Sequence, residues 1–185
     1  MLYAQLHLTL PAWIHDEVDQ DRLYADANSR IELAIELSRL NVKHGSGGPF
    51  GAGVFNESGR LIGVGVNLVL PTQCSVAHAE VMALATSQQR VQRYRLNESG
   101  ERITLACSAQ PCSMCYGALF WAGIDELLIG ARSEDVQNLA GFDEGPLPVD
   151  WSGELVKRGI SVQQGLMRDR ACDVLRDYGE SGVVY

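Results

Sequence analysis

Apolar residues recur at steps of three and four along the segment from Leu23 to Asn41, which predicts a helix with one buried face. Two short runs of β-prone residues follow over 51–55 and 60–67, and the polar turn 56–59 between them is typical of a hairpin. The next segment, 77–94, contains no Gly or Pro and is rich in good helix formers, so it is expected to form a second helix. The first half of the chain therefore predicts a helix, an antiparallel strand pair and another helix.

The second half of the chain continues to alternate strands and helices. Pro111 suits the first turn of a helix, because its missing N–H would have no partner there. The predicted strands are 103–108, 127–131 and 160–166, the predicted helices are 111–122, 133–139 and 168–178, and 141–146 is expected to be a loop. This order predicts a three-layer α/β/α sandwich with a mixed sheet of about five strands, in which the strands on either side of the 111–122 helix run parallel.

A single domain over residues 1–185 is expected, because this length suits one hydrophobic core. Residues 1–20 are expected to form an extension packed on that domain. No apolar segment reaches the length that spans a membrane, and Met1 to Leu10 lacks a basic region ahead of a long apolar stretch. These features predict a cytoplasmic protein that has no membrane partner.

The charge balance of the chain bears on its partners. The formal net charge is −8, from 23 acidic residues against 15 Lys and Arg. A phosphate backbone is repelled by this average, so no nucleic-acid partner is expected and a small neutral or weakly charged substrate is favoured. The 5 cysteines are an odd number, which favours free thiols and a metal site over a disulfide framework.

Two short motifs supply candidate metal ligands at the predicted starts of two helices. They are His78-Ala79-Glu80 and Pro111-Cys112-Ser113-Met114-Cys115. Cys112 and Cys115, three residues apart, face the same side of a helix, and the positive end of the helix favours their thiolates. One imidazole and two thiolates would hold one zinc ion per chain and leave its fourth position open, as in catalytic zinc sites.

Glu80 gives this predicted zinc site a chemical purpose. A carboxylate beside a zinc-activated water acts first as a general base and then, once protonated, as a general acid toward a ring nitrogen and a leaving amine. This combination describes hydrolytic deamination. The alternative is a structural zinc closed by a distant fourth ligand, His44 or Cys74, in a non-catalytic zinc scaffold where Glu80 would have no task.

The two motifs together resemble the zinc signature of the cytidine deaminase superfamily. Within it the chain is most similar to bacterial guanine deaminases of this fold. The resemblance covers about 31–145 and includes 47–52 after the first helix, Asn67 at the end of the second strand, the stretch 111–121, and the loop 141–144.

The resemblance implies roles for residues outside the zinc motifs. It implies that Asn67 and the Ala79 amide hydrogen-bond the base and that Phe50 and Trp121 enclose its ring. It also implies that Glu144 passes a proton to the departing ammonia.

The chain departs from the family pattern at two positions. Ser113 stands where proline is usual between the cysteines, and Glu144 stands where aspartate is often found, which leaves the reach of the proton carrier open. The family also places a C-terminal tail over a partner's active site, so 168–185, ending in Tyr185, is expected to cap a site and the chain is expected to form a homodimer.

Guanine is the expected substrate, with amino-triazines as secondary substrates because they present a similar amidine edge. The alternatives are a tRNA adenosine deaminase and a cytosine or cytidine deaminase. A tRNA enzyme needs a basic groove for the RNA backbone, whereas this chain has Lys43 and Lys157 as its only lysines.

Overall fold

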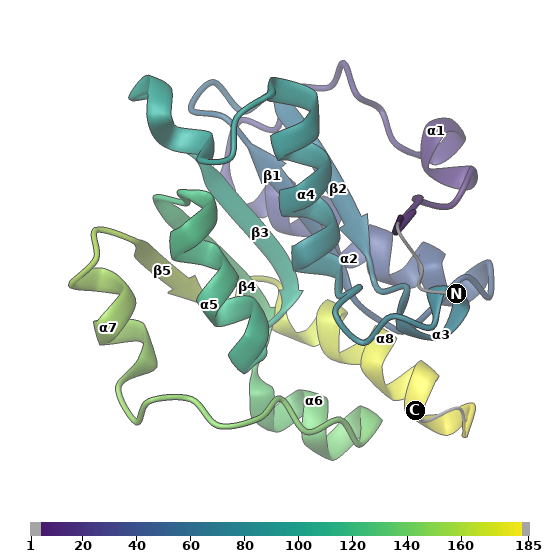
Figure 1. The fold of residues 1–185 in the computed structure, drawn as a ribbon. Helices are drawn as coiled ribbons and strands as arrows, with labels where there is room; N and C mark the ends of the chain where they lie inside the picture. Colours follow the sequence, from purple (N-terminus) through teal and green to yellow (C-terminus); the bar gives the residue numbers. More distant parts are fainter. Residues whose placement is uncertain (1–4, 183–185) are drawn as a thin grey trace.

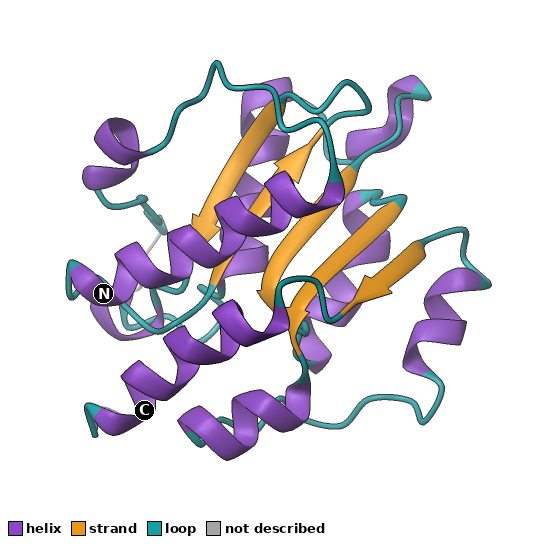
Figure 2. Ribbon diagram, turned by 180° about the vertical axis from the view of Figure 1, so that it is seen from behind, coloured by secondary structure: helices purple, strands orange, loops and turns teal. Residues whose placement is uncertain are grey.

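Helices cover both faces of a central sheet in the computed structural model, which describes residues 5–182 (Figures 1 and 2). The five strands lie in the order β2-β1-β3-β4-β5. Their bounds are β1 Gly51–Phe55, β2 Leu61–Val66, β3 Thr104–Ala109, β4 Glu126–Ala131 and β5 Ser161–Gln164.

Two pairs of longer helices form the outer layers. Helices α4 and α5 cover one face of the sheet, and α2 and α8 cover the other (Figures 1 and 2). The helix bounds are α1 Trp13–Glu17, α2 Ala27–Lys43, α3 Val69–Thr72, α4 Ala79–Val91, α5 Ser113–Ala122, α6 Ser133–Ala140, α7 Trp151–Val156 and α8 Arg168–Glu180, with a 3₁₀ turn at Leu96–Ser99. The predicted three-layer α/β/α sandwich is confirmed.

The sheet is mixed, as predicted. Strand β1 pairs antiparallel with both β2 and β3, whereas β3, β4 and β5 are parallel to one another. The parallel pair β3 and β4 is joined by α5, which is the connection expected from the sequence. Consequently β2, β3 and β4 all end at the same edge of the sheet, and the segments that follow them gather there.

The strands bury both of their faces. In β4, Leu127 and Ile129 join the core beneath α4 and α5, while Leu128 joins the core on the α2 and α8 side. All three side chains are fully buried. This explains why the strand reads as a continuous apolar run, as strands of parallel sheets covered on both faces do.

Glycine in β2 brings α4 directly onto the sheet. A Cβ atom at Gly65 would collide with the carbonyl oxygen of Ala79 and the backbone nitrogen of Ala83, both in the first half of α4. Because the first turn of α4 lies against the backbone of β2, the residues at the start of this helix are held close to the sheet edge.

Three short helices were not expected from the sequence. Helices α1, α3 and α7 have 5, 4 and 6 residues, which is too short for an apolar period to show. Within the predicted extension, Ile14 of α1 and the following Val18 are buried against the core. Tyr185 lies outside the described residues. Among those residues no helix is both long enough and apolar enough to cross a bilayer.

Candidate zinc and deaminase site

The two motif segments meet at the edge of the sheet where β2 and β3 end. His78 is the N-cap of α4, and Cys112 is the N-cap of α5. Both helices therefore point their positive ends at one place, which suits anionic thiolates and carboxylates. Cys115 lies one turn into α5 and faces the same side as Cys112.

The donor atoms of His78, Cys112 and Cys115 all lie within 4.8 Å of one another. The Cys112 Sγ is 3.5 Å from the His78 Nδ1. Tetrahedral zinc with its usual bond lengths would separate a sulfur and a nitrogen ligand by about 3.6 Å, so the spacing of Cys112 and His78 suits this ion.

Among the described residues, no fourth His, Cys, Asp or Glu completes this cluster. His44 lies elsewhere, stacked on Trp13 with 5.2 Å between ring centroids. The described residues thus offer three protein ligands, the number found in catalytic zinc sites, and His44 and Cys74 are not among them.

The contact between the two cysteines shifts their pKa values in opposite directions, down for Cys112 and up for Cys115. The pKa of Cys112 is lowered to about 4, because its sulfur is hydrogen-bonded first by the Cys115 thiol and then by the His78 ring and the Cys115 backbone N–H. The same contact with Cys112 raises the pKa of His78. Cys112 is therefore the thiol that ionises first.

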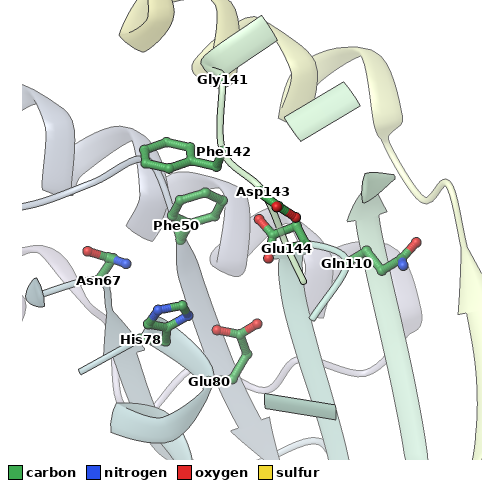
Figure 3. Close-up of a pocket in the computed structure, with 9 residues that line it drawn as sticks. All are labelled: Phe50, Asn67, His78, Glu80, Gln110, Gly141, Phe142, Asp143 and Glu144. Atoms are coloured by element: carbon green, nitrogen blue, oxygen red, sulfur yellow. The ribbon is translucent and has the colours of Figure 1, made fainter. Parts of the chain in front are cut away.

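Glu80 lies beside the ligands in the first turn of α4 and is only 7% exposed. Burial raises its pKa to about 7, with a further contribution from the negative charge of Cys112. In the close-up, its carboxyl group points into the cavity next to His78 (Figure 3). A carboxyl with a pKa near neutrality can both accept and release a proton, as a general acid–base group must.

A cavity of about 400 Å³ opens above these residues (Figure 3). It lies within the size range of small-molecule sites. The residues lining it are Phe50, Asn67, His78, Glu80, Gln110, Gly141, Phe142, Asp143 and Glu144.

The upper wall of the cavity is aromatic. Phe50, just before β1, meets Phe142 edge to face with 5.3 Å between centroids, and Phe142 stacks on Tyr178 of α8 at 5.9 Å. The structure thus places Phe50 and Phe142 in the cavity wall, and Tyr178 of α8 supports the Phe142 ring from outside the lining.

Asn67 follows β2 and is 1% exposed. Its Oδ1 accepts a hydrogen bond from the Val69 N–H at 3.3 Å, which leaves the Nδ2 facing the cavity (Figure 3). Its backbone oxygen accepts a hydrogen bond from the Nδ2 of Asn41 at 2.9 Å, and the same Nδ2 donates to Gly48 O at 2.8 Å. Asn41, which is fully buried, therefore ties together the two segments that carry Phe50 and Asn67.

Glu144 points into the cavity from the loop that follows α6 (Figure 3). Burial raises its pKa to about 8, with further contributions from the nearby charges of Glu80 and Cys112. Its backbone oxygen accepts a hydrogen bond from the Ser113 N–H at 2.9 Å. The structure thus brings the proposed proton carrier to the metal ligands.

Two predicted substrate contacts differ from the cavity lining. Ala79 is buried and is the first residue of α4, so its amide lacks a partner within the helix, but it is not a lining residue. Trp121 is 77% exposed and lies in a separate surface groove between α4 and α5. It stands six residues beyond Cys115, about 9 Å further along the helix, and does not enclose a ring bound in this chain's cavity.

Three lining side chains were missed from the sequence: Gln110, Phe142 and Asp143. Each adjoins a predicted site segment, since Gln110 precedes the Pro-Cys motif and the other two precede Glu144. Only this adjacency in the sequence could have indicated that Gln110, Phe142 and Asp143 line the cavity. The direction of their side chains depends on the fold.

A family model of the cytidine and deoxycytidylate deaminase zinc-binding region matches residues 26–131, which is more than half of the chain and includes all three candidate ligands. The chain belongs to this family of zinc-binding deaminases. The predicted membership in the cytidine deaminase superfamily is confirmed, as is the similarity to bacterial guanine deaminase. The enzyme is an aminohydrolase, which replaces an amine on a ring by an oxygen from water.

The deaminase has relatives with different substrates. It is 35% identical over 114 residues to the guanine deaminase of Bacillus subtilis, covering 62% of this chain and 69% of the relative. It is 31% identical over 125 residues to a tRNA-specific adenosine deaminase of Buchnera aphidicola, covering 68% and 75%. A solved structure of guanine deaminase from Nitrosomonas europaea is 42% identical in sequence, with a TM-score of 0.91, and the match covers 97% of this chain and 99% of that one.

Proposed function

We propose that this deaminase acts on a free purine base and converts guanine and water to xanthine and ammonia. The observation that carries the proposal is the cavity lining, which includes Glu80, Asp143 and Glu144, while none of the lining residues is a Lys or Arg. Such a lining disfavours a phosphorylated substrate and favours a neutral base. The likeness to guanine deaminases over nearly the whole chain supports guanine.

The cavity walls suit a flat ring with a hydrogen-bond acceptor on its edge. Phe50 presents an aromatic wall, and the Asn67 Nδ2 is available as a donor because its Oδ1 is already bonded to Val69. We assign both to base binding, together with the Ala79 amide. In structures with 8-azaguanine, variants of a similar enzyme change an asparagine and a glutamate, the residue types of Asn67 and Glu144.

His78, Cys112 and Cys115 would hold the zinc ion. When bound, zinc supplies Lewis acidity that lowers the pKa of a coordinated water to about 7. Glu80 accepts a proton from the water as the water oxygen bonds to the carbon that carries the amine. Glu80 then passes this proton to the adjacent ring nitrogen.

Glu144 completes the reaction by protonating the amine. The carbon–nitrogen bond breaks and ammonia leaves. The hydroxyl group that remains on the carbon gives its proton to Glu144 and becomes the carbonyl of the product. Both carboxyl groups thus return to their starting states. Burial, together with the nearby charges of Glu80 and Cys112, raises the pKa of Glu144 to about 8, which favours the protonated form that a donor needs. Its neighbour Glu80, with a pKa of about 7, is poised to exchange protons in both directions.

A substrate panel tests this proposal. Zinc-loaded protein is incubated with guanine, cytosine, cytidine, adenosine and amino-triazines while ammonia is measured. Guanine is expected to be turned over fastest, with triazines as secondary substrates. Turnover of cytidine but not of guanine would refute guanine as the substrate.

The Glu80→Gln variant separates an enzyme from a zinc scaffold. It is expected to lose at least about 100-fold in kcat, because the amide cannot accept a proton, while zinc content stays at one ion per chain. A protein with zinc but no turnover to lose would favour the scaffold.

A second candidate, deamination of adenosine in tRNA, is favoured by the likeness to the Buchnera enzyme. Inosine formation in tRNA, together with tight and salt-sensitive tRNA binding, would support it. The acidic cavity argues against it.

A homodimer, a C-terminal cap and a cytoplasmic location stay predictions. Light scattering of the purified protein tests whether it forms a homodimer.

A further inference from the structure

The loop that carries Glu144 is fastened to the helix that carries the two cysteines. Ser113 is the first residue of α5, and its backbone N–H donates to the Glu144 carbonyl oxygen at 2.9 Å. An N–H at this position has no partner within its own helix, so it is free to bind another segment. The contact therefore joins Glu144 to a residue that lies between Cys112 and Cys115.

A second contact holds the same loop at the same residue. Gly145 has a φ of +71°, and a Cβ atom there would lie 2.6 Å from the Ser113 Oγ. The backbone of the loop is thus packed tightly against Ser113. The Gly145 N–H also donates to the Asp143 Oδ1 at 2.8 Å, which closes the turn on the other side of Glu144.

These contacts hold the backbone at Glu144 against the helix that carries the two cysteines. The carboxyl of Glu144 extends from this backbone into the cavity that His78 and Glu80 also line (Figure 3). We propose that the Ser113 backbone N–H is a positioning group, which holds Glu144 where it can protonate the leaving amine. This inference rests on the proton-donating role proposed for Glu144.

Proline at position 113 would remove this hydrogen bond while sparing the helix. Proline lacks the N–H but is well suited to the first position of a helix. The preceding residue, Cys112, has φ −65° and ψ 172°, an extended conformation that a following proline permits. Ser113→Pro thus deletes the donor, and Ser113→Ala, which keeps the donor and loses only the hydroxyl, is the matched control.

The test compares Ser113→Pro with Ser113→Ala. We expect kcat on guanine to be about 10- to 100-fold lower in S113P than in S113A, since displacing a proton donor slows the step that it serves. KM, zinc content and Tm should be similar in the two variants. Equal kcat values would overturn the proposal, and a loss of zinc in S113P would show that the residue serves the ligands instead.

A double-substitution cycle separates this proposal from the one it rests on. In a Glu144→Gln background, S113P should lower kcat no further than S113A does, because the donor to be positioned is gone. A full kcat for E144Q alone would refute the role of Glu144 itself. A slow E144Q with equal S113P and S113A would refute only the positioning role.

Hydrogen exchange gives a readout that does not depend on turnover. The amide of Gly145 should exchange faster in S113P than in S113A, because the loop has lost its attachment to α5. If S113P fails to fold, Gly145→Ala serves in its place: its kcat should recover in part when S113A removes the colliding Oγ. Equal losses with and without that hydroxyl, or unchanged loop exchange, would overturn the proposal.

Discussion

Replacement of Asn41 by Ala tests whether one buried amide holds the substrate-binding segments together. Asn41 is neither a lining residue of the cavity nor a candidate metal ligand, yet its Nδ2 donates to the carbonyl oxygens of Gly48 and Asn67 at 2.8 and 2.9 Å. Its Oδ1 accepts a hydrogen bond from the Ser46 Oγ at 2.8 Å. The substitution removes all three bonds from a fully buried position.

The expected cost follows from what each partner keeps. The Gly48 carbonyl still accepts the Phe50 N–H at 2.8 Å, so it loses a bond without being left unsatisfied. The Asn67 carbonyl loses the donor that Asn41 provides, which costs about 1–3 kcal/mol if no water replaces it. With the lost bond to Gly48, the free energy of unfolding should fall by roughly 2–4 kcal/mol.

Urea denaturation of the zinc-loaded protein measures this change, and steady-state kinetics on guanine measures its effect on the site. KM should rise more than kcat falls, because Phe50 and Asn67 are the residues proposed to bind the base, while Glu80 and the proposed zinc ligands stay in place. Ser46→Ala is the control, because it removes the hydroxyl that donates to the Asn41 Oδ1 but keeps both bonds that the Asn41 Nδ2 donates. It should cost about 1 kcal/mol. A loss below 1 kcal/mol in Asn41→Ala, or an unchanged KM, would refute the reasoning.

Three further predictions concern other parts of the molecule. Gly65→Ala should push α4 off the sheet, lowering zinc affinity and the free energy of unfolding by about 1–3 kcal/mol; normal zinc affinity would contradict the close packing described above. Asp135 accepts two hydrogen bonds from Arg168, at 2.7 and 2.8 Å, and these lower its pKa. The pair therefore stabilises the fold above about pH 4 and loses this effect as pH falls through the lowered pKa. Asp135→Asn should be about 1 kcal/mol less stable than the wild type at pH 7, and this difference in the free energy of unfolding should shrink in acid. A difference that is constant with pH would contradict this. Removal of zinc with a chelator should abolish turnover and expose Cys112. Because its pKa is about 4, Cys112 should react with iodoacetamide before Cys115 at pH 6. Peptide mapping that finds Cys115 alkylated first, or alkylation that added zinc does not prevent, would contradict this.

The deaminase chemistry could be predicted from the sequence because the residues that indicate it lie in two short motifs. His78, Glu80, Cys112 and Cys115 each lie within one turn of a helix start, and a helix start fixes side-chain directions over a few residues without knowledge of the rest of the fold. The same locality allowed the longer helices and the hairpin to be predicted.

The walls of the cavity could not be predicted in the same way. Phe142 lines it because its ring packs between Phe50 and Tyr178, which are distant in sequence, and no local pattern encodes that contact. Asn41 reads as an ordinary polar residue near the end of a helix, although it bonds to a carbonyl 26 positions away. Trp121 belongs to a family-like motif, but its place at the far end of α5 turns it toward a surface groove.

The aromatic contacts that join Phe50, Phe142 and Tyr178 allow the wall of the cavity to be engineered from outside the cavity. Tyr178 belongs to α8, which contributes no lining residue to the cavity, yet its ring supports the ring that does. A library of substitutions confined to position 178 would alter the width of the wall while every proton-handling group keeps its own neighbours. Selection for bulkier amino-substituted rings can therefore begin on a helix that takes no part in the chemistry.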